Sequence, residues 1–215
     1  MTTYNSRYSA HIAQTFAPED DALRSVAERL ARRGQPTYSI EPEEGRFLQC
    51  LTAMCNTRRA VEFGTLGGYS GVWIARGLSA RGRLITVELE PQRAQVARET
   101  FEQAGVADRI DLMEGDALAM LDDIATNGPF DLAFIDTSIH TYDRMLDWAL
   151  ENVRPGGIVA LHNAFQYGGL LSQAPQASSN SMYAFHQRFA NEPRLMGTIF
   201  PAGDGILFGV VRAFE

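Results

Sequence analysis

The sequence predicts an α/β fold with a doubly wound, mostly parallel sheet. Short apolar runs alternate with helical stretches after residue 58, and this alternation is typical of parallel strands whose connecting helices cover both faces of a sheet. A glycine-rich turn follows the first of these runs, which is where doubly wound folds bind nucleotides. The last two runs flank only Pro-Ala-Gly-Asp-Gly, so we expect an antiparallel hairpin near the C-terminus.

The apolar runs and the stretches between them locate the individual elements. The predicted strands are 60–63, 84–87, 110–113, 130–135, 158–161, 195–200 and 206–211. The predicted helices of this region are 68–78, 91–104, 117–124, 141–153 and 180–190. Strands and helices follow one another without a linker or an internal repeat, which predicts one domain over residues 1–215.

The first 57 residues predict a helical region in front of the sheet. Residues 18–33 place their apolar side chains on one helix face. A second helix is expected from about Pro42 to Met54, because proline favours a first turn and acidic residues face the positive end of the helix dipole. We expect residues 1–57 to contribute to a lid and to a subunit contact, and residues 58–215 to form the core.

Composition excludes several classes of partner. The net charge of −7 and the absence of a basic run argue against nucleic acid or an anionic membrane. Cys50 and Cys55 are not spaced like zinc ligands or a disulfide framework, which predicts free thiols in a reducing cytoplasm. No apolar run reaches the ~20 residues that span a bilayer, and the polar start does not resemble a signal peptide. All 19 basic residues are arginine, so the chain has no lysine.

The loop after the first strand, VEFGTLGGYS at 61–70, indicates the kind of cofactor. It lacks the G-x-G-x-x-G pattern of dinucleotide sites and the lysine of a Walker loop. Glu62, an acid before the first glycine, would repel a phosphate but can accept a hydrogen bond from an ammonium group. S-adenosylmethionine (SAM) carries an ammonium and a sulfonium and has no phosphate, so this loop favours SAM.

Two further acids support a nucleoside ligand. Glu88 ends the second predicted strand, 24 residues beyond Gly64, where an acid can accept hydrogen bonds from ribose hydroxyls. Asp116 and Ala117 follow the third strand, where they can meet an adenine edge. Because the three signals follow consecutive strands, the sequence predicts a SAM-dependent methyltransferase.

Seven segments together resemble the caffeoyl-CoA/catechol type of class I O-methyltransferase, especially its bacterial members. They are IEPEEGRFL at 40–48, VEFGTLGGYS at 61–70, AGVADRI at 104–110, FDLAFID at 130–136, RPGGI at 154–158, EPR at 192–194 and PAGDG at 201–205. The resemblance implies a Rossmann-like sheet of seven strands and a homodimer. The SAM contacts that the loops and the resemblance predict are Ile40, Glu62, Gly64, Thr65, Ser70, Glu88, Asp116, Ala117 and Asp136, and Tyr167 is implied to contact the acceptor.

The resemblance also implies a divalent cation, and here the sequence departs from the family. The family holds the cation with an Asp after the fourth strand, which matches Asp136, and an Asp-Asn pair after the fifth. That pair aligns with His162 and Asn163, so one carboxylate has become an imidazole. The family's lysine, thought to help deprotonate the acceptor, is replaced by Ile139 in DTSIHTY at 136–142.

Two interpretations of this region follow. In the first, Asp136, His162 and Asn163 still bind a cation, and imidazole suits Mn, Fe or Zn better than Mg. In the second, the metal is lost and His162 is the general base, oriented by Asp136, since an imidazole pKa near ~6.5 suits that role. His140, next to the missing lysine position, is a further candidate base.

The leading function is therefore methyl transfer from SAM to a hydroxyl group of a small, aromatic acceptor. One alternative is methyl transfer to a nitrogen atom or to a hydroxyl group on modified RNA, although the net negative charge of the chain disfavours RNA. Another alternative is a SAM-binding module without catalytic activity, since the lysine and one carboxylate are missing. We expect a cytoplasmic homodimer with a small-molecule acceptor as its partner.

Overall fold

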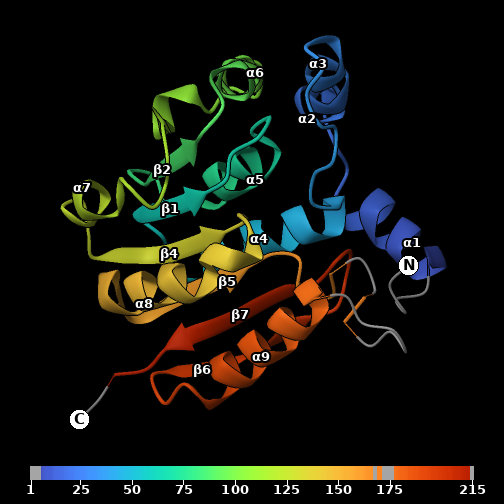
Figure 1. Ribbon diagram of the computed structural model, residues 1–215. Helices are drawn as coiled ribbons and strands as arrows, with labels where there is room; N and C mark the ends of the chain where they lie inside the picture. Colours follow the sequence, from blue (N-terminus) through green and yellow to red (C-terminus); the bar gives the residue numbers. More distant parts are fainter. Residues whose placement is uncertain (1–5, 167–168, 171–176, 214–215) are drawn as a thin grey trace.

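The computed structural model describes residues 6–166, 169–170 and 177–213, which include a seven-stranded sheet (Figure 1). Its strands are β1 (Arg59–Phe63), β2 (Arg83–Glu88), β3 (Ile110–Glu114), β4 (Phe130–Ile135), β5 (Val153–Leu161), β6 (Leu195–Phe200) and β7 (Ile206–Val211). Their order in the sheet is β3-β2-β1-β4-β5-β7-β6. The first five strands pair in parallel, whereas β7 pairs antiparallel with both β5 and β6. The predicted fold class is confirmed.

Helices precede the sheet and connect its strands. The N-terminal ones are α1 (Ser6–Phe16), α2 (Asp21–Arg24), α3 (Val26–Arg32) and α4 (Pro42–Met54). The others are α5 (Tyr69–Gly77), α6 (Pro91–Gln103), α7 (Leu121–Ala125), α8 (Tyr142–Asn152) and α9 (Ala177–Asn191), with short 3₁₀ turns η1 (Ala107–Arg109) and η2 (Ile139–Thr141). The predicted positions of α4, α5, α6 and α8 agree with these bounds to within a residue or two.

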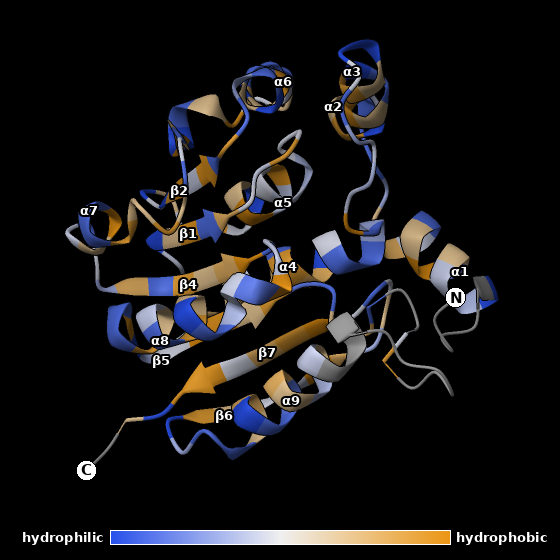
Figure 2. Ribbon diagram, in the orientation of Figure 1, coloured by the Kyte–Doolittle hydropathy of each residue, from blue (hydrophilic) through white to orange (hydrophobic). Residues whose placement is uncertain are grey.

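Helices cover both faces of the sheet. Successive side chains of a strand point to opposite faces, and apolar side chains lie on both faces, so each face needs a cover. In β4, Leu132 and Phe134 face a core that includes α3 to α6, whereas Ala133 and Ile135 face a second core with α7, α8 and α9. Figure 2 shows the apolar strands between helices whose outer faces are polar. A parallel sheet buried on both faces leaves only its strand ends open to a ligand.

The N-terminal region differs from the prediction in two places. Residues 6–16 form α1, for which no helix was predicted. The single helix expected over 18–33 is divided at Ser25, whose hydroxyl donates to the carbonyl of Asp21 at 2.6 Å. A serine that bonds to the backbone in this way competes with the regular helical hydrogen bonds.

The helix after β3 is also shorter than predicted, since it begins at Leu121 and not near residue 117. The side chain of Asp116 accepts a hydrogen bond from the Leu118 N–H at 2.8 Å and so stabilises a turn there. Within the described part of the chain, no helix is long and apolar enough to cross a lipid bilayer.

Candidate active site

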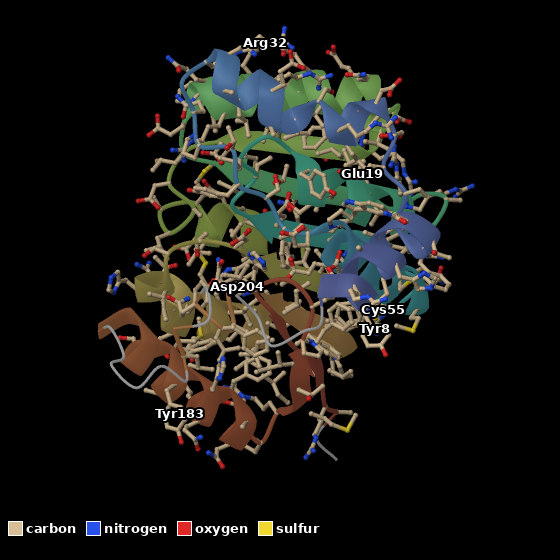
Figure 3. All side chains as sticks on the ribbon, turned by 90° about the vertical axis from the view of Figure 1, so that its right-hand side faces the viewer. Tyr8, Glu19, Arg32, Cys55, Tyr183 and Asp204 are labelled. Atoms are coloured by element: carbon tan, nitrogen blue, oxygen red, sulfur yellow. The ribbon has the colours of Figure 1, made fainter. Side chains whose placement is uncertain are left out.

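A cavity of about 660 Å³ lies at the carboxyl ends of the parallel strands. Its wall comes from the loops after β1 to β5, from the start of α4 and from the turn between β6 and β7. Figure 3 looks onto this side of the molecule, with Asp204 of the β6–β7 turn near the middle of the view. The cavity wall includes Ile40, Gly64, Thr65, Ser70, Glu88, Asp116, Ala117, Asp136, His162 and Asn163, all predicted as site residues.

The loop after β1 brings bare backbone to the cavity. Gly64 has a φ of +97°, and a Cβ atom there would collide with the backbone carbonyl of Asp136. Gly68 has a φ of +85°, and a Cβ atom there would collide with the ring of Phe101. Only glycine meets both conditions, so the loop can pack closely against Asp136 and α6. Gly64 itself lies on the cavity wall, where it presents backbone without a side chain.

Glu62 does not occupy the predicted position on the cavity wall. Its side chain is fully buried, and its two carboxylate oxygens accept hydrogen bonds from Ser70 at 2.5 Å and Thr86 at 2.6 Å. Burial raises its pKa to about 7, although the two hydroxyl groups oppose this shift. The first turn of α5 covers Glu62, so its contact with the cavity runs through Ser70, which lies on the wall.

Glu88 places a fixed carboxylate at the end of β2. One of its oxygens accepts from the Leu66 N–H at 2.7 Å, and the other accepts from the Glu90 N–H at 3.0 Å. The side chain is 5% exposed and lies 3.8 Å from the guanidinium of Arg93. These contacts fix the direction of its remaining lone pairs, as the recognition of two ribose hydroxyls requires.

His162 lies between two carboxylates at the end of β5. Its Nδ1 is 3.4 Å from an oxygen of Asp136, and its Nε2 is 3.3 Å from Oε1 of Glu44. Nε2 and Oε1 are both enclosed, and their contact is an ion pair when the ring is protonated. The backbone is fixed as well, because the His162 carbonyl accepts from the Tyr142 hydroxyl at 3.0 Å.

This setting changes the acid–base behaviour expected of His162. Burial lowers its pKa, but Asp136 and Glu44 raise it more strongly, to well above the ordinary value of 6.5. The imidazolium form is therefore favoured near neutral pH. Sequence reasoning expected an unperturbed imidazole because it did not bring Glu44 to the site.

Glu44 is the residue that the sequence interpretation missed. It belongs to the first turn of α4, where its Oε2 accepts from the Glu41 N–H at 2.8 Å and forms a capping box with Glu41. It is completely buried, and Gly203 of the β6–β7 turn lies against its carboxylate. The E-x-x-E spacing of Glu41 and Glu44 was a readable signal that the second acid bends back toward the helix start.

Asp136, His162 and Asn163 do lie together, but their arrangement does not fit a shared cation. Asn163 donates its amide group to Asp136 at 2.9 Å, and its own Oδ1 is buried without a hydrogen-bond partner. A ring held between two carboxylates favours a protonated state without a lone pair for a metal. Within the described residues, no group of three or more His, Cys, Asp and Glu side chains could hold a metal ion.

Two other predicted residues fall outside the site as described. His140 is exposed on η2 and does not line the cavity, because the neighbouring Ile139 takes the inward position against the core under α8. The prediction of His140 as a base is therefore corrected. Tyr167 lies outside the described residues.

The fold and this cavity define a Rossmann-like methyltransferase, and comparisons with known proteins specify it further. A family model described as O-methyltransferase matches residues 13–212. The chain is 37% identical over 165 residues to a catechol O-methyltransferase of Niastella koreensis, covering 76% of this chain and 75% of that protein. It is 33% identical over 208 residues to a catechol O-methyltransferase of Mycobacterium tuberculosis, covering 94% of each.

A solved structure agrees with these matches. An O-methyltransferase from Bacillus cereus in complex with SAH superimposes with a TM-score of 0.86 at 32% identity, covering 96% of this chain and 97% of that one. The chain belongs to the O-methyltransferase family. The predicted enzyme class, a SAM-dependent methyltransferase, is thereby confirmed.

Proposed function

We propose that this protein transfers the methyl group of SAM to a hydroxyl group of a small aromatic acceptor, with His162 as the base. The observation that carries the proposal is one cavity with two different ends. The loops after β1, β2 and β3 form the first end, and Asp136, His162 and Glu44 form the second.

The first end fits SAM by its shape and its donor set. The bare backbone at Gly64 admits a ligand at close range, and Glu88 offers carboxylate oxygens to the ribose. Asp116 and Ala117 border the same end and can meet the adenine, while Ser70 is held by Glu62. SAM supplies an electrophilic methyl group on a sulfonium, which a nucleophile must approach in line.

The second end can remove the proton that an acceptor hydroxyl must lose. Nε2 of His162 is enclosed against Glu44, so the Nδ1 edge, beside Asp136, is the one that an acceptor can reach. In the neutral ring, Nε2–H stays with Glu44 and Nδ1 accepts the proton from the acceptor oxygen. Asp136 then stabilises the imidazolium that forms, and Glu44 has the orienting role that the sequence interpretation gave to Asp136.

A base of this kind gives the reaction a definite pH dependence. His162 must be neutral to accept a proton, and Asp136 and Glu44 hold its pKa well above 6.5. The value of kcat/KM therefore rises with pH above neutrality until His162 has lost its proton. The charged groups beside it are Glu44 from α4 and Asp136 after β4, with Asp204 and Glu41 also on the cavity wall.

Two measurements test the proposed function. Calorimetry with SAH is expected to show one site per chain, and methyl transfer from labelled SAM to catechol is expected to yield a methyl ether. Binding of SAH without transfer to any phenolic acceptor would contradict the acceptor class. Absence of SAH binding would contradict the assignment of the first end.

We also propose a homodimer and a cytoplasmic location. Within one domain, we propose that residues 1–57 contribute to a lid and to the subunit contact and that residues 58–215 form the core. The support is the family resemblance and the composition of the chain. Sedimentation equilibrium at several protein concentrations tests the dimer directly.

A further inference from the structure

Residues 35–41, which we call the strap, join α3 to α4 along the first end of the cavity, the cofactor end. Tyr38, Ser39, Ile40 and Glu41 lie on the cavity wall. The side chain of Ile40 is buried and packs into the core, whereas that of Tyr38 is exposed. The strap is therefore part of the enclosure of any cofactor that binds at this end.

The middle of the strap is held by few contacts. Within the described part of the chain, residues 36–40 form no hydrogen bond to another segment. The strap is instead fastened at its two ends. Glu41 is tied to α4 by the capping box with Glu44, and Gln35 is tied to α6. A segment with so few hydrogen bonds opens locally at a low free-energy cost once one end is released.

Arg93 of α6 fastens the strap at Gln35. The Nε of Arg93 donates to Oε1 of Gln35 at 3.0 Å, and the Gln35 amide group donates to Oε1 of Gln92 at 2.9 Å. The guanidinium of Arg93 also lies 3.8 Å from the carboxylate of Glu88. Among the described residues of the cavity wall, Arg93 is the only basic side chain at the cofactor end. It therefore joins the strap to the acid that is proposed to bind the ribose.

The helix before the strap is held by contacts of its own. Arg33, directly after α3, pairs with Glu99 of α6 at 2.7 Å, and Arg29 of α3 donates to the hydroxyl of Thr100 at 3.0 Å. Figure 1 shows α3 beside α6, with the chain running from there to α4. The strap can therefore move while α3 stays docked on α6.

We propose that the strap opens to admit SAM and to release SAH, and that Arg93 is the positioning residue that holds it closed. Arg93 acts through Gln35, by fixing the strap, and through Glu88, by fixing the direction of its carboxylate. The inference rests on the proposed placement of SAM at the cofactor end. It is independent of the acceptor and of His162.

A closed strap has a kinetic signature that a direct contact with the cofactor lacks. Weakening the contact between Arg93 and Gln35 lets the strap open more often in both the empty and the loaded protein. Both the association and the dissociation rate constants of SAH then rise, and the Kd changes less than either rate. Loss of a direct contact raises mainly the dissociation rate constant and leaves the association rate constant nearly unchanged.

Arg93→Gln and Gln35→Ala weaken this contact from its two sides. Surface plasmon resonance on the immobilised protein gives both rate constants for SAH, whose net charge of zero limits direct electrostatic effects. We expect each rate constant to rise roughly threefold to tenfold in each variant, the effect of one hydrogen bond. The double variant is expected to add little, because both substitutions break the same contact.

Two matched controls lie on the same helix. Arg98→Gln and Gln95→Ala make the same chemical changes on α6 at positions that do not line the cavity. We expect both to keep the wild-type rate constants. Gln35 is half-buried and outside the core clusters, so Gln35→Ala tests the contact in a folded protein even if Arg93→Gln is unstable.

Each outcome supports or overturns one statement. A rise of both rate constants in Arg93→Gln and Gln35→Ala, without a change in the controls, supports the strap. Unchanged rate constants in both variants overturn the inference and leave the proposed function in place. A rise of the dissociation rate constant alone overturns the opening of the strap and makes Arg93 a cofactor contact. Absence of SAH binding to the wild type overturns the proposed placement of SAM and the inference together.

Discussion

The two ends of the cavity differ in how closely they follow the family pattern. The loops after β1, β2 and β3 keep the glycines and the acid that the resemblance predicts for a SAM site. The loops after β4 and β5 have lost a lysine and a carboxylate, and an imidazole held by Glu44 and Asp136 lies there instead. Under the proposed function, cofactor recognition and proton removal belong to separate loops, so the second can differ from the family pattern while the first matches it.

The largest effect is expected at His162. His162→Gln removes the proposed base and is expected to lower kcat by roughly 10²–10⁴-fold, the usual contribution of a positioned base. Binding of SAH should change little, because the other end of the cavity holds the cofactor. His140→Gln is the matched control on exposed η2 and should keep its activity. Equal losses in both variants would remove His162 from the mechanism.

A smaller effect is expected at the cofactor end. Glu88→Gln replaces the carboxylate proposed to bind the two ribose hydroxyl groups, and we expect the Kd of SAH to rise by roughly tenfold, as for a lost charged hydrogen bond. The exposed neighbour Glu90 is the control, since Glu90→Gln leaves the cavity wall unaltered. Calorimetry gives both affinities, and unchanged binding in Glu88→Gln would place the ribose elsewhere.

The smallest of these effects is a shift in the pH profile. Glu44→Gln removes one of the charges that raise the pKa of His162, so the rising limb of kcat/KM should move toward lower pH. The measurement is kcat/KM for catechol over a pH series in both proteins. A limb that stays in place would show that Glu44 does not act through His162, even if the overall rate falls.

The sequence predicted the sheet well because each strand has its own local signal. Apolar runs such as 130–135 and the Gly-Asp-Gly turn between β6 and β7 are short-range patterns. The break at Ser25 was missed because it depends on one side-chain hydrogen bond to the preceding turn, from Ser25 to the Asp21 carbonyl. α1 was missed because it packs against α4, where Ser9 hydrogen-bonds to Glu43. Helix propensity, summed over a short stretch of sequence, contains no information about such contacts.

The candidate site was predictable only where it depends on one loop at a time. Gly64 and Glu88 each follow a strand, so their place at the cavity follows from topology. Glu44 is more than 100 residues from His162 in the chain, and nothing local pairs them. Glu62 was misplaced for a related reason, since the first turn of α5 covers it.

The most direct test of the base at the second end is a metal-depletion assay. Wild type and His162→Gln are treated exhaustively with chelator, and methyl transfer from SAM to catechol is measured before and after. We predict that the wild-type rate is unchanged by the chelator and that His162→Gln is roughly 100-fold or more slower in both conditions. Loss of the wild-type rate with chelator, and its return on adding Mn²⁺ or Mg²⁺, would contradict the account and restore a metal to this site.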